Sequence, residues 1–296
     1  MVNMTIALVG DGQQWMFSND WDVCEANGWL HVEDLDGWYG GVGAAVTPDT
    51  KRFQRHGSFP APSIRGPRKM DLTLTWLDTI EDSLGSYSHF SRLASGIAWD
   101  YGPYAMTVRE EGETLSTLVQ LDGEIQHKAV VEHGETAFRI KIPLRAQDPF
   151  LYGPEQIHTV RPNSKSLVLM DPMFKETGSG EQVMDWLYDS PEYVRLTNPG
   201  TATAYPTYTV VADSPMGVRL SAGGQTIEYA LPLFPSSPLT LDMSGHAIMD
   251  GRDVSSRLRK REWHSIPPGG GSVTPVVDFF EGGSGYVTAS VRPTYI

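Results

Sequence analysis

Turn-forming residues interrupt this sequence at short intervals, and they constrain its fold more than any other feature. The chain contains 30 glycines and 21 prolines that follow no period. Glycine accepts the positive φ angles of tight turns, and proline fixes its φ angle at a value that many turns need. Such a composition predicts many short strands joined by turns, and so a β-rich chain.

Strand-like alternation of apolar and polar residues supports this prediction. Phe138, Ile140 and Ile142 alternate with charged residues in the stretch AFRIKIPL, which is typical of a strand with one buried and one solvated face. The dipeptide Asp122-Gly123 separates two further strand-like stretches and is a strong hairpin signal. Residues 103–153 are therefore predicted to form a β-meander.

Apolar residues recur at helical spacing in one convincing segment, from about residue 79 to residue 96. Asp78 and Thr79 are suitable capping residues at its start, and Gly96 lies near its end. A ligand slot could also use aromatic residues at this spacing, but an apolar helix face usually packs onto a sheet. We therefore predict one helix that packs against the core. Its apolar positions are Ile80, Leu84, Tyr87, Phe90, Leu93 and Ile97.

The length of 296 residues is typical of two domains. The Asp148-Pro149 dipeptide ends regular strand pairing, because proline has no backbone donor. We therefore predict a first domain over residues 1–150, made of β-sheets and the helix. A second domain over residues 155–296 has only short strands and turns, which favours a β-sandwich or jelly roll.

Two glycine clusters near the C-terminus pose a choice between a phosphate-binding loop and ordinary turns. A phosphate loop needs a lysine, a hydroxyl residue and a helix after its glycines. No lysine follows Gly269–Gly271, and after Gly282–Gly285 the residues Val287, Ala289 and Val291 alternate with polar ones as in a strand. Both clusters are therefore predicted to be turns between strands.

Residue patterns for chemistry are missing from the sequence. The eight histidines are scattered without an HExxH pair, and GxSxG does not occur. Cys24 is the only cysteine, so no intrachain disulfide or cysteine-based zinc cluster can form. Acidic pairs such as Asp278 with Glu281, or Asp34 with Asp36, are best interpreted as solvated residues. We predict no catalytic residue, metal site or cofactor, and hence no enzyme.

Charge and hydropathy exclude other classes. The net charge of −13 weighs against tight binding to nucleic-acid phosphates. The opening MVNMTIALVGDGQQW lacks the basic segment of a signal peptide. No stretch approaches the roughly 18 apolar residues of a membrane-spanning helix. We therefore expect synthesis in a cytoplasm and no membrane insertion.

Residues 47–69 form a basic, proline-rich stretch without periodicity and are predicted to be a long loop or arm. Loops of this length are often functional, so the stretch is a candidate contact surface. The alternative is a surface loop without a partner. The candidate assembly residues are Lys51, Arg52, Arg55, Arg65, Arg68 and Lys69.

Several motifs in the second half occur in an order that resembles a known family. They are YVRLTNPGTATAYPTYTVVA, LTLDMSGHAIMDGRDVS, EWHSIPPGGGSV and GYVTASVRPTY. This order resembles the C-terminal half of distal tail proteins, also called minor tail proteins, of long-tailed non-contractile bacteriophages. The resemblance covers residues 140–296, and more loosely residues 70–147.

The resemblance implies a structural virion protein at the distal tip of the tail, made in the host cytoplasm. It implies an N-terminal belt domain of β-sheets with a helix and a C-terminal galectin-like β-sandwich. Copies of the chain would form a homohexameric ring that joins the tail tube to the tail tip or baseplate. The expected partners are the tube protein, the tail-tip hub, the tape measure, and fibres or receptor-binding proteins, while DNA would pass through the lumen without specific binding.

Two alternatives remain open at this stage. The galectin-like half could be a carbohydrate-binding module that contacts host glycans through Trp186, Tyr188 or Tyr193. A cell-wall hydrolase of the tail tip is disfavoured, because the sequence shows no nucleophile or zinc motif.

Overall fold

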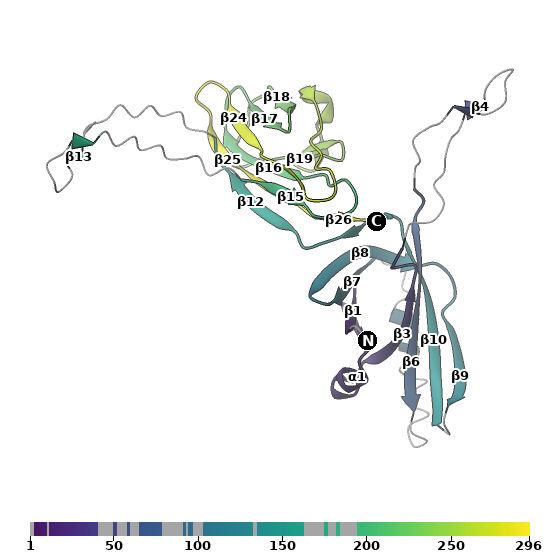
Figure 1. Cartoon of the computed structure of the whole chain (residues 1–296). Helices are drawn as coiled ribbons and strands as arrows, with labels where there is room; N and C mark the ends of the chain where they lie inside the picture. The colour runs from purple at the N-terminus through teal and green to yellow at the C-terminus, as the bar shows by residue number, and fades with distance from the viewer. Residues whose placement is uncertain are drawn as a thin grey trace. The chain divides into compact units, whose positions relative to one another are not determined.

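The computed structural model describes residues 3–10, 12–40, 50–51, 58–59, 65–78, 91–92, 94–96, 103–132, 135–162, 175–176, 182–183 and 194–296. The chain divides into two compact units, and strands dominate both (Figure 1). One unit comprises Met1–Pro154 with Thr294–Ile296, and the other comprises Glu155–Pro293. The predicted mainly-β fold is confirmed.

A ten-stranded sheet dominates the first unit, and its strands pair antiparallel except β2 with β3. Its strands are, in spatial order, β26 (Thr294–Tyr295), β11 (Leu151–Tyr152), β8 (Glu113–Leu121), β7 (Tyr104–Glu110), β1 (Met4–Gly10), β2 (Gln13–Ser18), β3 (Leu30–Asp36), β6 (Arg68–Asp78), β10 (Glu135–Ala146) and β9 (Gln126–Glu132). β8 also pairs with β10 through Leu121 opposite Leu144. The strands from β8 to β10 therefore close into a barrel-like circuit.

Alternating side chains of these strands fill the core of the first unit. Ile6 and Leu8 of β1, Leu72 and Leu74 of β6, and Ile142 of β10 are fully buried. Such rows are what period-two sequences produce when one sheet face is removed from water. The strand that the sequence predicts around AFRIKIPL is confirmed as part of β10.

The last three residues of the chain belong to the first unit, although the sequence placed them in the second domain. The reason is backbone pairing: Leu151 of β11 lies opposite Tyr295 of β26, and Tyr152 lies opposite Thr294. The chain thus returns to the first unit after completing the second.

A short helix that the sequence analysis missed, α1 (Trp21–Asn27), connects β2 to β3. The carboxylate of Asp20 caps its start by accepting bonds from the amides of Asp22 and Val23, and Gly28 ends it in the left-handed region at φ 66°. Cys24 is the buried side chain of this helix. Of the helix predicted over residues 79–96, residues 91–92 and 94–96 are helical, and the rest lies outside the described residues.

Two packed sheets form the second unit. The larger one consists of β12 (Gln156–Val160), β25 (Ser284–Val291), β16 (Thr207–Asp213), β19 (Leu239–Asp242), β20 (His246–Met249) and β21 (Arg252–Asp253). The other consists of β22 (Leu258–Arg261), β18 (Gln225–Tyr229), β17 (Val218–Ala222) and β24 (Val276–Phe279). Smaller elements are the pair β15 (Leu196–Asn198) with β23 (Gly271–Val273), and the 3-10 turn η1 (Ser255–Arg257).

Both sheets contribute side chains to one core, which makes the second unit a β-sandwich. Tyr208 of β16 and Leu220 of β17 are completely buried in it. The inward row predicted from the sequence, Val287, Ala289 and Val291, is confirmed as part of this core.

The glycine clusters are turns, as the sequence predicted. Gly269 and Gly270 have φ angles of 74° and 85°, and β23 begins at the next residue. The buried Asn198 holds this turn. Its backbone carbonyl accepts from Gly270 N at 2.9 Å, and its side-chain amide donates to Ile266 O at 3.1 Å. Gly282 also has positive φ and precedes β25.

Two more strand pairs lie outside the sheets described above. They are β4 (Thr50–Lys51) with β5 (Ser58–Phe59), and β13 (Lys175–Glu176) with β14 (Gln182–Val183).

Candidate functional site

The basic segment 47–69 is described only in part. β4 pairs with β5 inside it. Arg52, Arg55 and the side chain of Lys51 lie outside the described residues, whereas Arg65 is described and exposed. Lys69 is also exposed, and its Nζ lies 3.1 Å from Asp122 Oδ2 in the first unit.

Arg68 is not a residue of a surface arm, because it is the first residue of β6 and is 2% exposed. Its Nε donates to Pro149 O at 3.0 Å, and its Nη1 donates to Gly37 O at 3.1 Å and Trp38 O at 2.9 Å. Burial lowers the pKa of the guanidinium, and Arg65 lowers it further. Arg68 therefore joins three backbone carbonyls of its own unit.

An aromatic surface with few cations lies around the start of β1 in the first unit. The ring of Trp21, which is 44% exposed, stacks on His31 with 3.8 Å between centroids. Burial lowers the pKa of His31, whose Nε2 lies 3.1 Å from Asn19 O. Asn19 Oδ1 in turn accepts from Met4 N at 2.7 Å.

Tyr39 is also exposed on this surface and is hydrogen-bonded to the carboxylate of Glu110. Its hydroxyl donates to Glu110 Oε2 at 2.6 Å and lies 3.6 Å from the sulfur of Met4, while its side chain is 58% exposed. Burial and the carboxylate of Glu110 both raise the pKa of Tyr39. The first 50 residues of the sequence contain no lysine or arginine, and the neighbouring cation is the exposed Arg109 beside Glu110 on β7. The surface defined by Trp21, Tyr39 and Glu110 is therefore a candidate for contact with a cationic partner.

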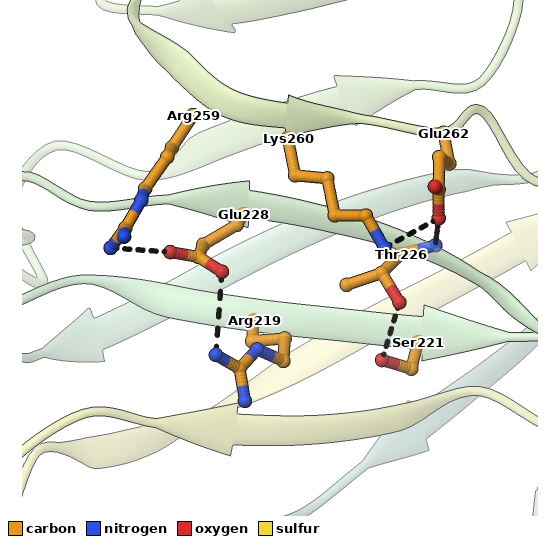
Figure 2. A network of polar contacts seen from close by, with 7 residues as sticks. All are labelled: Arg219, Ser221, Thr226, Glu228, Arg259, Lys260 and Glu262. Atoms are coloured by element: carbon orange, nitrogen blue, oxygen red, sulfur yellow. Dashed lines mark hydrogen bonds and ion pairs between the residues drawn. The ribbon is translucent and has the colours of Figure 1, made fainter.

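A polar network covers the outer face of the four-stranded sheet in the second unit (Figure 2). Glu228 of β18 lies at its centre and is 7% exposed. Its Oε2 lies 3.3 Å from Arg219 Nη2, and its Oε1 lies 3.2 Å from Arg259 Nη1. Glu228 thus lies between two guanidinium groups, and the exposed Asp278 of β24 lies opposite Arg219.

The rest of the network continues along the same strands. Lys260 Nζ lies 2.8 Å from Glu262 Oε2, which also accepts from Thr226 N at 2.9 Å. The hydroxyls of Thr226 and Ser221 are 3.3 Å apart. Bonds from Lys260 and Thr226 outweigh desolvation and lower the pKa of the Glu262 carboxyl. The network was missed at the sequence level, although the basic run RLRKRE in β22 is a signal for it.

A second buried titratable group, His264, belongs to the core and not to a surface. It is completely buried, and its Nδ1 lies 3.4 Å from the hydroxyl of Tyr208. Its backbone amide donates to the sulfur of Met243 at 3.3 Å. Burial lowers the pKa of His264 to about 4, so the ring is neutral at pH 7.

The aromatic residues suggested for glycan contact, Trp186, Tyr188 and Tyr193, lie outside the described residues. Within the described residues no group of three or more His, Cys, Asp or Glu side chains is arranged to hold a metal ion. In the same part of the chain, no helix has the length and hydropathy needed to cross a bilayer.

Comparison with known proteins finds a likeness of structure. No family model matches the chain, and no curated protein matches it. The crystal structure of SPP1 Dit (gp 19.1), described as a paradigm of the hub adsorption apparatus in phages that infect Gram-positive bacteria, aligns with a TM-score of 0.60 over 99% of both chains at 11% identity. A chain of the activated phage P2 baseplate with Ca aligns over 99% of this chain and 98% of that one, with a TM-score of 0.45 and 11% identity. Over its full length, this chain thus has the fold of SPP1 Dit.

Proposed function

We propose that this protein is a structural component of a phage virion and forms a homohexameric ring at the distal end of the tail. The observation that carries the proposal is the shared fold with SPP1 Dit, which extends over both units and leaves almost no part of either chain unmatched. The order of motifs in the second half of the sequence supports it independently. The ring would join the tail tube to the tip and hold host-recognition proteins, and the protein would do no chemistry.

A ring requires a heterologous interface that closes. The surface of Trp21, Tyr39 and Glu110 offers exposed aromatic rings and a carboxylate. The segment 47–69 offers cations, of which Lys51, Arg52, Arg55, Arg65 and Lys69 remain candidates. We propose that these cations contact this surface on the neighbouring copy, because opposite charges select and orient partners.

Electron microscopy and native mass spectrometry of the purified chain test the ring. Sixfold particles with a central channel are the expected result, either for the chain alone or after mixing with the tail tube protein of the same phage. Monomers at micromolar concentration, together with assembled tails that lack a ring of this chain, would refute the proposal.

Glycan contact is the alternative function, and it rests on Trp186, Tyr188 and Tyr193. A glycan array with the full chain tests it directly. Binding that disappears on replacing these three residues by alanine would favour a carbohydrate-binding module.

A further inference from the structure

Neighbouring turns at one end of the β-sandwich carry exposed apolar side chains. Met216, Leu231 and Phe234 are 46%, 40% and 59% exposed. The amides and carbonyls of Ser214 and Leu233 bond to each other at 2.8 and 3.1 Å, so the turn after β16 lies against the segment after β18. These three exposed side chains are called the apolar patch.

A third turn joins this patch to the polar network. Phe280 N, just after β24, donates to Gly217 O at 3.1 Å, which places Phe280 next to the turn that contains Met216. The guanidinium of Arg219 lies over the ring of Phe280, 5.1 Å from its centroid. A chain of contacts therefore leads from the turn of Met216 through Phe280 to Arg219 and, through Glu228, to Arg259.

Gly217 shows that this arrangement is built into the backbone. Its φ angle is 92°, and an added Cβ would lie 1.9 Å from Tyr229 O and 3.0 Å from Leu231 O. Only glycine allows the turn to approach the second segment so closely. The apolar patch is thus held by main-chain contacts and does not depend on mobile side chains.

The chemistry of this surface specifies its occupant. Methionine, phenylalanine and arginine are enriched at protein interfaces, where an apolar centre is ringed by polar groups. The side chains of Arg219 and Arg259 are 45% and 75% exposed, and both contact the carboxylate of Glu228. The exposed Asp278 also lies opposite Arg219. Arg259 belongs to the basic run of β22, so it retains the greater capacity to bind acidic groups. An anionic polysaccharide would use the arginines but not the apolar patch.

We propose that this surface docks an acidic segment of another tail protein, which inserts an apolar side chain at Phe234 and pairs its carboxylates with Arg219 and Arg259. This inference rests on the proposed role at the tail tip and adds to it a defined surface and a defined partner chemistry. It concerns a peripheral protein held by the sandwich, and not the contacts that close the ring.

The test uses phage that carry variants of the full chain. Phe234→Ser and Arg259→Glu should each give virions that keep the ring and lose one tail protein at least tenfold, as quantified by mass spectrometry of purified tails. Ile157→Ser and Lys128→Glu are matched controls, because Ile157 is 61% exposed on β12 and Lys128 is exposed on β9. Both controls should retain normal composition.

A photo-crosslinking residue at position 234 identifies the occupant. The expected product joins this chain to a segment of another tail protein that is rich in aspartate and glutamate around an apolar residue. A product with a basic segment, no product, or unchanged tail composition in both variants would overturn the proposal. So would binding of purified anionic wall polymer that needs Arg259 but not Phe234. Tails without a ring of this chain would instead refute the proposed function itself.

Discussion

Replacing Arg68 by methionine should destabilise the first unit far more than a surface substitution does. The change removes the donors for the carbonyl oxygens of Pro149, Gly37 and Trp38, which arginine bonds at 2.9 to 3.1 Å. Methionine has a similar length and no polar head, so the cavity term is small. The main effect is the loss of these three bonds at a site that is 2% exposed.

The magnitude follows from two opposing terms. Each buried carbonyl left without a donor costs about 1–3 kcal/mol, so three of them cost roughly 3–9 kcal/mol. Methionine also avoids the cost of burying a guanidinium, which offsets part of this loss. Replacing buried charged groups by apolar ones can raise the free energy of unfolding by about 1–4 kcal/mol. Taking the middle of each range, about 6 less about 2.5 kcal/mol, the expected net loss for Arg68→Met is about 3.5 kcal/mol in the free energy of unfolding.

Urea unfolding of the full chain, followed by the fluorescence of the tryptophans and by circular dichroism, measures this loss. Arg65→Met is the matched control, because the exposed Arg65 should change the free energy by no more than about 0.5 kcal/mol. Arg68→Lys should also destabilise, since a single ammonium cannot reproduce the planar fork. A loss below about 1 kcal/mol for Arg68→Met would refute the assignment of these bonds.

Further predictions concern the second unit and the basic segment. Gly217→Ala should lower the free energy of unfolding of the sandwich by more than about 2 kcal/mol, because Gly217 has positive φ and an added Cβ would clash with backbone atoms. Gly224→Ala is the control and should cost about 1 kcal/mol, because Gly224 has positive φ but open space around it. Urea unfolding measures both losses, and equal losses would contradict the clash at Gly217. The pKa of His264 falls from 6.5 to about 4 on folding. The free energy of unfolding should therefore be largest above pH 6.5 and should fall by roughly 3 kcal/mol as the pH drops towards 4. His264→Gln should remove that part of the pH dependence in unfolding titrations. Deleting residues 50–64 should leave a folded chain, as circular dichroism would show, yet prevent tail joining in a complementation assay; normal tails would contradict the arm. Residues 155–293 expressed alone should melt cooperatively and hydrolyse no cell-wall substrate, and any turnover in zymography would reveal a missed active site.

The parts of the fold that the sequence predicts are those governed by local rules. Ile140 and Ile142 are readable as buried positions because a half-solvated sheet imposes a period of two. Gly269 and Gly270 are readable as a turn because glycines accept positive φ and the β-branched residues that follow favour a strand. These signals need only neighbouring residues, so one sequence suffices to find them.

A short helix that is marked only by its capping residues is difficult to predict from one sequence. Helix α1 has seven residues and buries Cys24 alone among its side chains, so no apolar stripe marks it. Its signals are the capping residues, Asp20 at the start and Gly28 at the end, at a spacing that fits two turns of helix. Attention to capping without periodicity could have found it.

The remaining features can be identified only from the position of residues in the folded chain. Arg68 looks like one more cation of a basic loop, and only the folded chain shows carbonyls from residues 37, 38 and 149 around it. The apolar patch is equally invisible in sequence, because its members come from two separate turns that meet only in the folded chain, where β17 pairs with β18. Such residues occur throughout the sequence, and only their arrangement in the fold marks some of them as a contact surface. For this chain, the sequence therefore predicts architecture better than it predicts the surfaces through which that architecture would act.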